Sequence, residues 1–247
     1  MISLKICNNL NVDMVYCLYL EEYELRKKIA LEEFKKMNLN VKMFKGIYLK
    51  DKPHIGCKLS HINIIKDAKL NNYKNILICE DDVDFLGTFP INVNIPEDFG
   101  MFYLGYFDYD NLSVKDNNLD LNKDSNFSLM RLFYSRSTFC YILNEKTYDS
   151  ILANENTLDG TYAFIDMFYG GVIQNKFPSY GIYPLFANVK NIISTISNIE
   201  DNNISNLITE KAKSSYEKDV IINFYKMLNI KKPFHYNGIC YNNFINL

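Results

Sequence analysis

Tryptophan is absent from this 247-residue chain, and none of its six cysteines forms a C-x-x-C pair with another. The cysteines are scattered, and several of them lie in apolar stretches. This distribution favours reduced thiols in a core over a zinc site or a disulfide framework, although the even count leaves a framework open. The sequence therefore indicates a reducing compartment, and we expect the protein to be cytoplasmic.

The chain also lacks a strong excess of charge of either sign, since its formal net charge is −2 at pH 7. Such a balance gives no indication of a nucleic-acid partner or of a polyanionic one. The N-terminus has no basic region followed by a long apolar segment, and no apolar run reaches the roughly 18 residues that a membrane span needs. We therefore expect a protein without a transmembrane segment.

What the chain does contain is material for a core, because 48% of its residues are hydrophobic. This content is enough for one large domain, or for a domain with an extension. The composition turns polar at about 197–206, and an amphipathic helix is predicted beyond it at 207–228. The sequence therefore predicts a main domain at 1–200 and a helical extension at 201–247.

The order of the predicted elements indicates an α/β fold. Strands are predicted at 14–20, 41–44, 76–79, 101–104, 138–143, 179–183 and 185–189. Helices are predicted at 21–37, 53–70 and 144–153. The first three strands alternate with the first two helices, which implies right-handed parallel crossovers. The polar segment 106–130 is predicted to be a long loop, of the kind that often forms a lid or a binding segment.

Acidic residues follow the predicted strand at 76–79 without an intervening turn, namely Glu80, Asp81 and Asp82. Like charges this close repel, and burial at a strand end raises the pKa of each unless a cation neutralises the cluster. A hard divalent ion such as Mg²⁺ or Mn²⁺ is the simplest such cation. The carboxyl end of a strand is also where α/β folds place ligands. The alternative interpretation is a solvated acidic turn after a core strand.

The helix before this strand carries the sequence Gly-Cys-Lys-Leu-Ser-His at 56–61. In this order and spacing, the helix and the acidic triplet resemble the "GC-LSH" and EDD segments of glycosyltransferase family 25. That family includes bacterial lipooligosaccharide galactosyltransferases and the collagen galactosyltransferases. The resemblance covers about residues 13–196. Other similar positions are Arg26-Lys27, Tyr103-Leu104-Gly105, the strand at 138–143 and Ile165-Asp166.

The resemblance implies a GT-A type fold, an α/β/α sandwich. It also implies inverting transfer of a hexose, galactose or glucose, from a UDP-sugar donor to a hydroxyl of a glycan or glycosylated protein acceptor. The expected metal ion is Mn²⁺ (or Mg²⁺), held by Asp82, where it stabilises the charge that develops on the leaving nucleotide. By analogy, Glu80 and Asp81 contact the ribose or orient the metal ligands. The donor pocket is expected to include Arg26, Ser60 and His61.

Inverting transfer also needs a base beside the acceptor hydroxyl, and Asp166 is the residue we assign to this catalytic role. It is an isolated carboxylate in an apolar run, where burial would raise its pKa toward a useful range. The alternative for Asp166 is a helix N-cap or a structural hydrogen-bond acceptor.

The chain departs from the family pattern at Ser194-Thr195-Ile196, where the family has an acidic residue. This departure leaves open a catalytically silent relative that binds a nucleotide or a glycan. A Mg²⁺-dependent phosphotransfer domain is a further alternative, because receiver domains also place acids after a buried strand. In receivers, however, the acidic pair follows the first strand, whereas here it follows the third.

Overall fold

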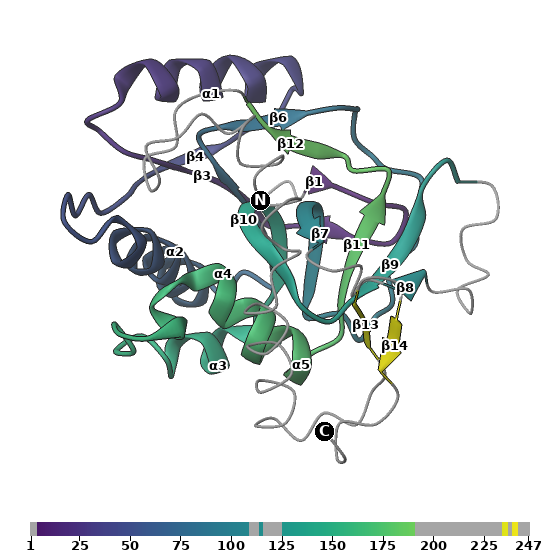
Figure 1. Cartoon of the computed structure of the whole chain (residues 1–247). Coiled ribbons are helices and arrows are strands. Elements are labelled where there is room, and N and C mark those ends of the chain that lie inside the picture. Colours follow the sequence, from purple (N-terminus) through teal and green to yellow (C-terminus); the bar gives the residue numbers. More distant parts are fainter. Residues whose placement is uncertain (1–3, 109–113, 116–124, 191–233, 237–238, 242–247) are drawn as a thin grey trace.

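The computed structural model describes residues 4–108, 114–115, 125–190, 234–236 and 239–241. Its centre is a mixed sheet (Figure 1). The strands of this sheet are β3 (Met14–Tyr19), β4 (Lys42–Lys45), β5 (Asn75–Glu80), β7 (Met101–Asp108), β8 (Val114–Lys115), β9 (Ser128–Leu132), β10 (Ser135–Asn144) and β11 (Ser179–Tyr183). Among the described residues they pair in the order β4-β3-β5-β10-β7-β11-β9-β8.

The first part of the sheet is parallel, as the sequence predicts. Strand β3 lies between β4 and β5 and pairs in parallel with both. The crossovers are α1 (Glu24–Lys36) and α2 (Pro53–Leu70), which match the predicted helices. All three carboxyl ends therefore lie at the same edge of the sheet. Beyond β5 the sheet becomes mixed, because β10 pairs antiparallel with both β5 and β7, while β11 is parallel to β7.

Side chains of successive strand residues point to opposite faces, so each face of the sheet has its own core. In β5, Leu77 and Cys79 pack in the core that includes Ala30 and Phe34 of α1. Ile76 and Ile78 pack in the other core, with the apolar side chains of α2. Figure 1 shows α1 on one side of the sheet and the other helices on the opposite side. The predicted α/β/α sandwich is thus confirmed.

The second face also carries the short helices α3 (Tyr148–Leu152), α4 (Ile165–Phe168) and α5 (Gln174–Lys176). A π-helical segment, Tyr169–Ile173, joins α4 to α5, and 3-10 turns lie at Glu145–Thr147 and Thr161–Ala163. The face that carries α1 also holds two small antiparallel sheets. These pair β1 (Leu4–Lys5) with β2 (Asn11–Val12), and β6 (Val83–Phe85) with β12 (Ala187–Val189).

The predicted loop at 106–130 is shorter than expected. Strand β7 continues to Asp108, β8 lies inside the segment, and β9 begins at Ser128. Pairing with β10 and β11 stabilises these polar ends as strands, which a prediction from local composition does not capture. Of the expected extension at 201–247, the structure describes an antiparallel pair, β13 (Phe234–Tyr236) and β14 (Ile239–Tyr241). The helix predicted at 207–228 lies outside the described residues, and no described helix is long and apolar enough to cross a membrane.

Candidate functional site

A pocket lies at the carboxyl edge of β3, β4 and β5. Its wall is formed by the ends of these strands, by the segments that follow them, and by the beginnings of α1 and α2. The lining residues are Leu18, Tyr19, Leu20, Arg26, Ile47, Tyr48, Leu49, Pro53, Cys57, Ser60, Glu80 and Asp81. Four of the predicted site residues, Arg26, Ser60, Glu80 and Asp81, are therefore brought together here, whereas His61, Asp82 and Asp166 are not in the lining.

Arg26, in the first turn of α1, binds both aspartates that follow β5. Its Nε lies 2.9 Å from Asp81 Oδ1, and its Nη2 lies 2.9 Å from Asp82 Oδ2. All three side chains are largely buried. Burial raises the pKa of Asp81, although the guanidinium group of Arg26 opposes this change. The guanidinium group thus supplies part of the positive charge that the acidic cluster requires.

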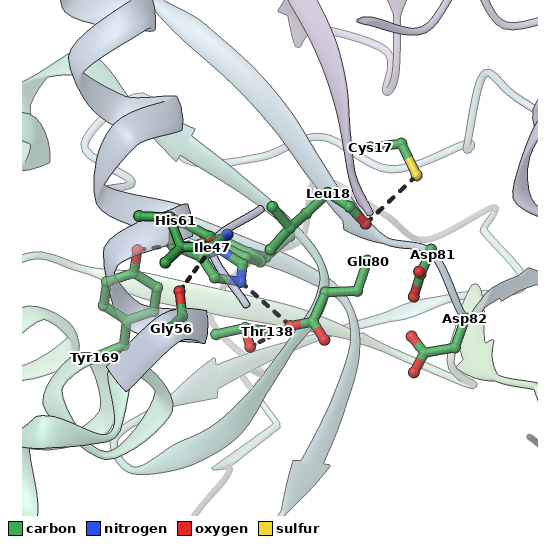
Figure 2. Close-up of polar contacts among 12 residues, drawn as sticks. Cys17, Leu18, Ile47, Gly56, His61, Glu80, Asp81, Asp82, Thr138 and Tyr169 are labelled. Carbon is green, nitrogen blue, oxygen red and sulfur yellow. Dashed lines mark hydrogen bonds and ion pairs between the residues drawn. The ribbon is translucent and has the colours of Figure 1, made fainter. Parts of the chain in front are cut away.

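Glu80 has a different set of partners, from α2 and β10 (Figure 2). Its Oε1 accepts a hydrogen bond of 2.5 Å from the Thr138 hydroxyl and lies 3.3 Å from His61 Nε2. The other ring nitrogen of His61 lies 2.7 Å from the Tyr141 hydroxyl. Burial acts to raise the pKa of Glu80, but the contacts with His61 and Thr138 outweigh burial and hold the pKa below its ordinary value. His61 therefore lies behind Glu80 and orients it.

An irregularity in β10 brings Thr138 to this position. The pairing of β10 with β7 shifts register between Arg136 and Cys140, and Ser137 has a φ of 101°, in the left-handed region that disfavours side chains. Bulges of this kind redirect side chains beside functional sites. Here the Thr138 hydroxyl reaches the carboxylate of Glu80 on the neighbouring strand.

Ser60 and Gly56 fix the wall of the pocket between β4 and α2. The Ser60 hydroxyl accepts a hydrogen bond from Ile47 N at 2.7 Å and donates one to Gly56 O at 2.6 Å. A Cβ atom on Gly56 would lie 2.4 Å from Ile47 O, so a larger residue would push this loop away from the helix. The Gly-x-x-x-Ser spacing of the motif therefore sets the position of the loop at Ile47, Tyr48 and Leu49.

Asp166 lies in the first turn of α4 and is half-buried. Its Oδ1 accepts a hydrogen bond of 2.8 Å from Met167 N. Burial raises the pKa of Asp166, and the charge of Arg136 opposes this effect, while the charge of Glu80 adds to it. The carboxyl group is thus electrostatically coupled to Glu80, although it comes from a distant part of the chain.

Two sets of side chains have the chemistry to hold a metal ion. The carboxylates of Asp81 and Asp82 are hard oxygen ligands that converge on one guanidinium nitrogen. Separately, Cys57, His61 and Glu80 bring three ligand atoms within 4.8 Å of one another. The sequence predicts no site role for Cys57, Thr138 or Tyr141, although all three lie in segments that resemble the family. Of these three, only Cys57 could have been recognised from the sequence, because it lies one helical turn before His61, a spacing at which two side chains can bind one metal ion. The departure at Ser194-Thr195-Ile196 lies outside the described residues.

A family model described as "Glycosyltransferase family 25 (LPS biosynthesis protein)" matches residues 13–165. Among solved structures, the chain is similar to a glycosyltransferase involved in the glycosylation of the major capsid of PBCV-1, with 11% identity over 68% of this chain and 80% of that chain, and a TM-score of 0.46. It is also similar to the nucleoside-diphosphate-sugar pyrophosphorylase from Vibrio cholerae RC9, with 11% identity over 78% and 80% of the two chains and a TM-score of 0.38. A comparison with curated proteins finds no match.

Proposed function

The chain belongs to glycosyltransferase family 25, and on that premise we propose that it transfers a hexose, galactose or glucose, from a UDP-sugar to a hydroxyl of a glycan or glycosylated protein, with inversion. The observation that carries the proposal is the pocket at the carboxyl edge of β3, β4 and β5, where Arg26 and the acids after β5 meet. This edge is where α/β sheets bind nucleotides.

The lining of the pocket suits a nucleotide. Apolar and aromatic side chains, among them Leu18, Tyr19 and Tyr48, offer surfaces on which a base can pack. Asp81 also lines the pocket and would accept hydrogen bonds from ribose hydroxyls, in the role that an acid takes in nucleotide-binding folds. Arg26 holds Asp81 in place and adds positive charge near the expected diphosphate.

The expected Mn²⁺ or Mg²⁺ ion fits the donor set on the Arg26 side of the site. Asp81 and Asp82 are neighbouring carboxylates, and oxygen ligands are the ones that these ions prefer. Asp82 would be the main ligand, and the bound ion would neutralise charge on the leaving diphosphate. Arg26 binds both carboxylates through one nitrogen, Nη2, so that they point toward the same place.

Asp166 is the proposed base for the acceptor hydroxyl. Its raised pKa moves it toward the range in which a carboxylate accepts a proton usefully at neutral pH. Asp166 comes from α4, a different element from the strand end that carries the donor-binding acids, although the charge of Glu80 influences its pKa.

Calorimetry with UDP tests the donor site directly. We expect tighter binding with Mn²⁺ than with EDTA, because the carboxylates and the diphosphate repel one another without a cation. Asp82→Asn should abolish the metal-dependent part of the affinity. Asp84→Asn is the matched control, because this acid lies two residues further along the chain, in β6, beyond the Asp81–Asp82 pair that Arg26 binds. Equal affinity with and without metal, or stronger binding of GDP than of UDP, would reject the proposal.

The family rules against the phosphotransfer alternative, because its members transfer sugars. A silent relative is distinguished by activity: a panel of nucleotide sugars with Mn²⁺, scored for donor hydrolysis, should show turnover of one UDP-hexose.

The free thiols of Cys7, Cys17, Cys57, Cys79 and Cys140 support a place in the reducing cytoplasm.

A further inference from the structure

One cluster of metal-binding side chains lies beside the proposed Mn²⁺ ligands but is distinct from them. Within the described part of the chain, Cys57, His61 and Glu80 are the group whose ligand atoms all lie within 4.8 Å of one another. We propose that these three side chains bind a zinc-type ion, Zn²⁺ or Co²⁺, whose open coordination position faces the pocket. Both Cys57 and Glu80 line that pocket, so an ion held by them is accessible to ligands there.

The spacing of the helical ligands supports the site. Cys57 and His61 are four residues apart on α2, so their side chains lie on one face, one turn apart. Pairs of ligands at this spacing hold zinc in helical metal sites. The absence of C-x-x-C pairs argued against zinc at the level of sequence. That argument does not apply to a zinc site made of a Cys-x-x-x-His pair on one helix and a third ligand from another element, here Glu80 at the end of β5.

The distances are close to those of a tetrahedral site. His61 Nε2 lies 3.3 Å from Glu80 Oε1. Zinc bonds of about 2.0 Å to nitrogen and oxygen place two ligands of a tetrahedron about 3.3 Å apart. These two ligands therefore need almost no movement. The Cys57 sulfur lies within 4.8 Å of both, whereas a zinc–sulfur bond of about 2.3 Å places it about 3.5 Å from each, so the sulfur would move closer by at most about 1.3 Å.

The contacts around the ligands are also those that zinc sites use. The Tyr141 hydroxyl lies 2.7 Å from His61 Nδ1 and fixes the ring so that Nε2 faces Glu80. The Thr138 hydroxyl donates to the same carboxylate oxygen of Glu80, Oε1, that His61 contacts. Such outer contacts orient the ligands of bound metals. One sulfur, one imidazole nitrogen and one carboxylate oxygen suit zinc, whereas Mg²⁺ and Mn²⁺ prefer oxygen ligands alone.

Binding changes the protonation of Cys57 but involves no oxidation or reduction. Burial raises the pKa of Cys57 well above its ordinary value, so the thiol carries its proton before the ion arrives. On binding, the S–H bond breaks, the proton leaves to solvent, and the sulfur binds the ion as a thiolate. Glu80 becomes a ligand at the same time. On the proposed function, zinc would therefore compete with the UDP-sugar for Glu80.

Cobalt spectroscopy on the full chain tests the metal site without any nucleotide. We expect Co²⁺ to produce the near-ultraviolet thiolate-to-cobalt absorption band, and added Zn²⁺ to remove it. Cys57→Ser should lose the band, whereas Cys7→Ala, which changes a buried cysteine in the core that includes α1, should keep it. No band in the wild-type protein, or a band that survives in Cys57→Ser, would overturn the proposal.

Calorimetry with UDP and Mn²⁺ then tests the competition. At zinc about ten times above its Kd, we expect the apparent Kd for UDP to rise about tenfold in the wild-type protein and to stay unchanged in Cys57→Ser. An equal rise in both proteins would overturn the competition while leaving the cobalt result intact. Failure of UDP to bind at all would count against the proposed function instead, since the cobalt experiment does not depend on it.

Discussion

The end of β5 has two sides, and they stabilise buried acids in different ways. On the side of α2 and β10, Glu80 receives hydrogen bonds from His61 and Thr138. On the side of α1, Asp81 and Asp82 share the guanidinium group of Arg26. Burial acts to raise the pKa on both sides, yet the pKa of Glu80 is lowered and that of Asp81 is raised.

The difference shows which side can gain from a further cation. Hydrogen bonds to the ionised form favour that form directly, so the charge of Glu80 is already compensated. One guanidinium group shared between two carboxylates is not enough to offset the burial of Asp81. A hard divalent ion that prefers oxygen ligands, such as Mn²⁺ or Mg²⁺, would therefore stabilise the Asp81–Asp82 side most, which is where the donor diphosphate is expected to bind.

The largest expected effect concerns Asp166, which extends the comparison to an acid on another element. If it is the base, Asp166→Asn should reduce transfer by roughly 10² to 10⁴, the usual contribution of general base catalysis. Donor and Mn²⁺ affinity should stay nearly unchanged. The measurement is transfer rate under saturating donor, together with UDP calorimetry.

The pH profile gives the same prediction a second readout. Burial raises the pKa of Asp166 above its ordinary 3.8, and Arg136 and Glu80 are the charged groups that modify this effect. Only the ionised form accepts a proton, so transfer by the wild-type enzyme should fall as pH decreases through this raised pKa. The limb should be absent in Asp166→Asn. A fully active Asp166→Asn enzyme, or one that loses melting temperature and donor affinity together, would contradict the role.

The second largest effect should come from removing the shared cation with Arg26→Met. Two largely buried carboxylates then lose their partner, and breaking such a pair destabilises a protein by about 3 to 5 kcal/mol. The loss should shrink at acid pH, because Asp81, whose pKa burial already raises, then takes up a proton and no longer carries an uncompensated charge. Urea unfolding at neutral and acid pH measures both effects.

Lys27→Met is the matched control for Arg26→Met. Lys27 is the next residue of α1, but its ion pair with Glu24 is 4.0 Å long and more exposed. Surface pairs of this kind contribute about 0 to 1 kcal/mol. Equal destabilisation by the two substitutions would show that the Arg26 contacts do not differ from ordinary surface pairs.

Much of the parallel unit could be predicted from the sequence, because its signals are local. The helix predicted at 53–70 has the bounds of α2, since Pro53 favours a first turn and apolar residues recur along the segment. The acids after the strand at 76–79 lie at the expected edge. Arg26 lies in the pocket as expected, since it lies in the first turn of α1, the helix that follows β3.

The Glu80 side could not be predicted, because it depends on strand order. Strand β10 lies between β5 and β7 although β7 comes first in the chain, and local patterns do not determine this insertion. Without it, Thr138 and Tyr141 have no visible relation to Glu80 or His61. The positive φ of Ser137 within β10 could not be predicted either, since serine is not a residue that indicates a positive φ.

The smallest expected effect tests the Glu80 side of β5, the side that the sequence does not predict. Thr138→Val removes the hydroxyl that donates to Glu80 but keeps a side chain of similar shape, so a charged acceptor loses one of its partners. Hydrogen bonds to charged groups contribute about 1.5 to 3 kcal/mol, and we expect a loss of that size at neutral pH. Burial opposes ionisation of Glu80, but its partners lower its pKa overall. A group with a lowered pKa in the folded state contributes stability above its unfolded pKa, and this contribution disappears as pH falls through the folded pKa. The difference in the free energy of unfolding between wild type and Thr138→Val should therefore shrink toward acid pH.

Thr147→Val is the control, because this buried threonine donates to the neutral carbonyl of Asn144 at 2.8 Å, and its effect should not depend on pH. The same pH dependence in the two variants would mean that Thr138 does not stabilise an ionised Glu80. The lowered pKa of Glu80, in contrast to the raised pKa of Asp81, would then be explained by His61 without Thr138.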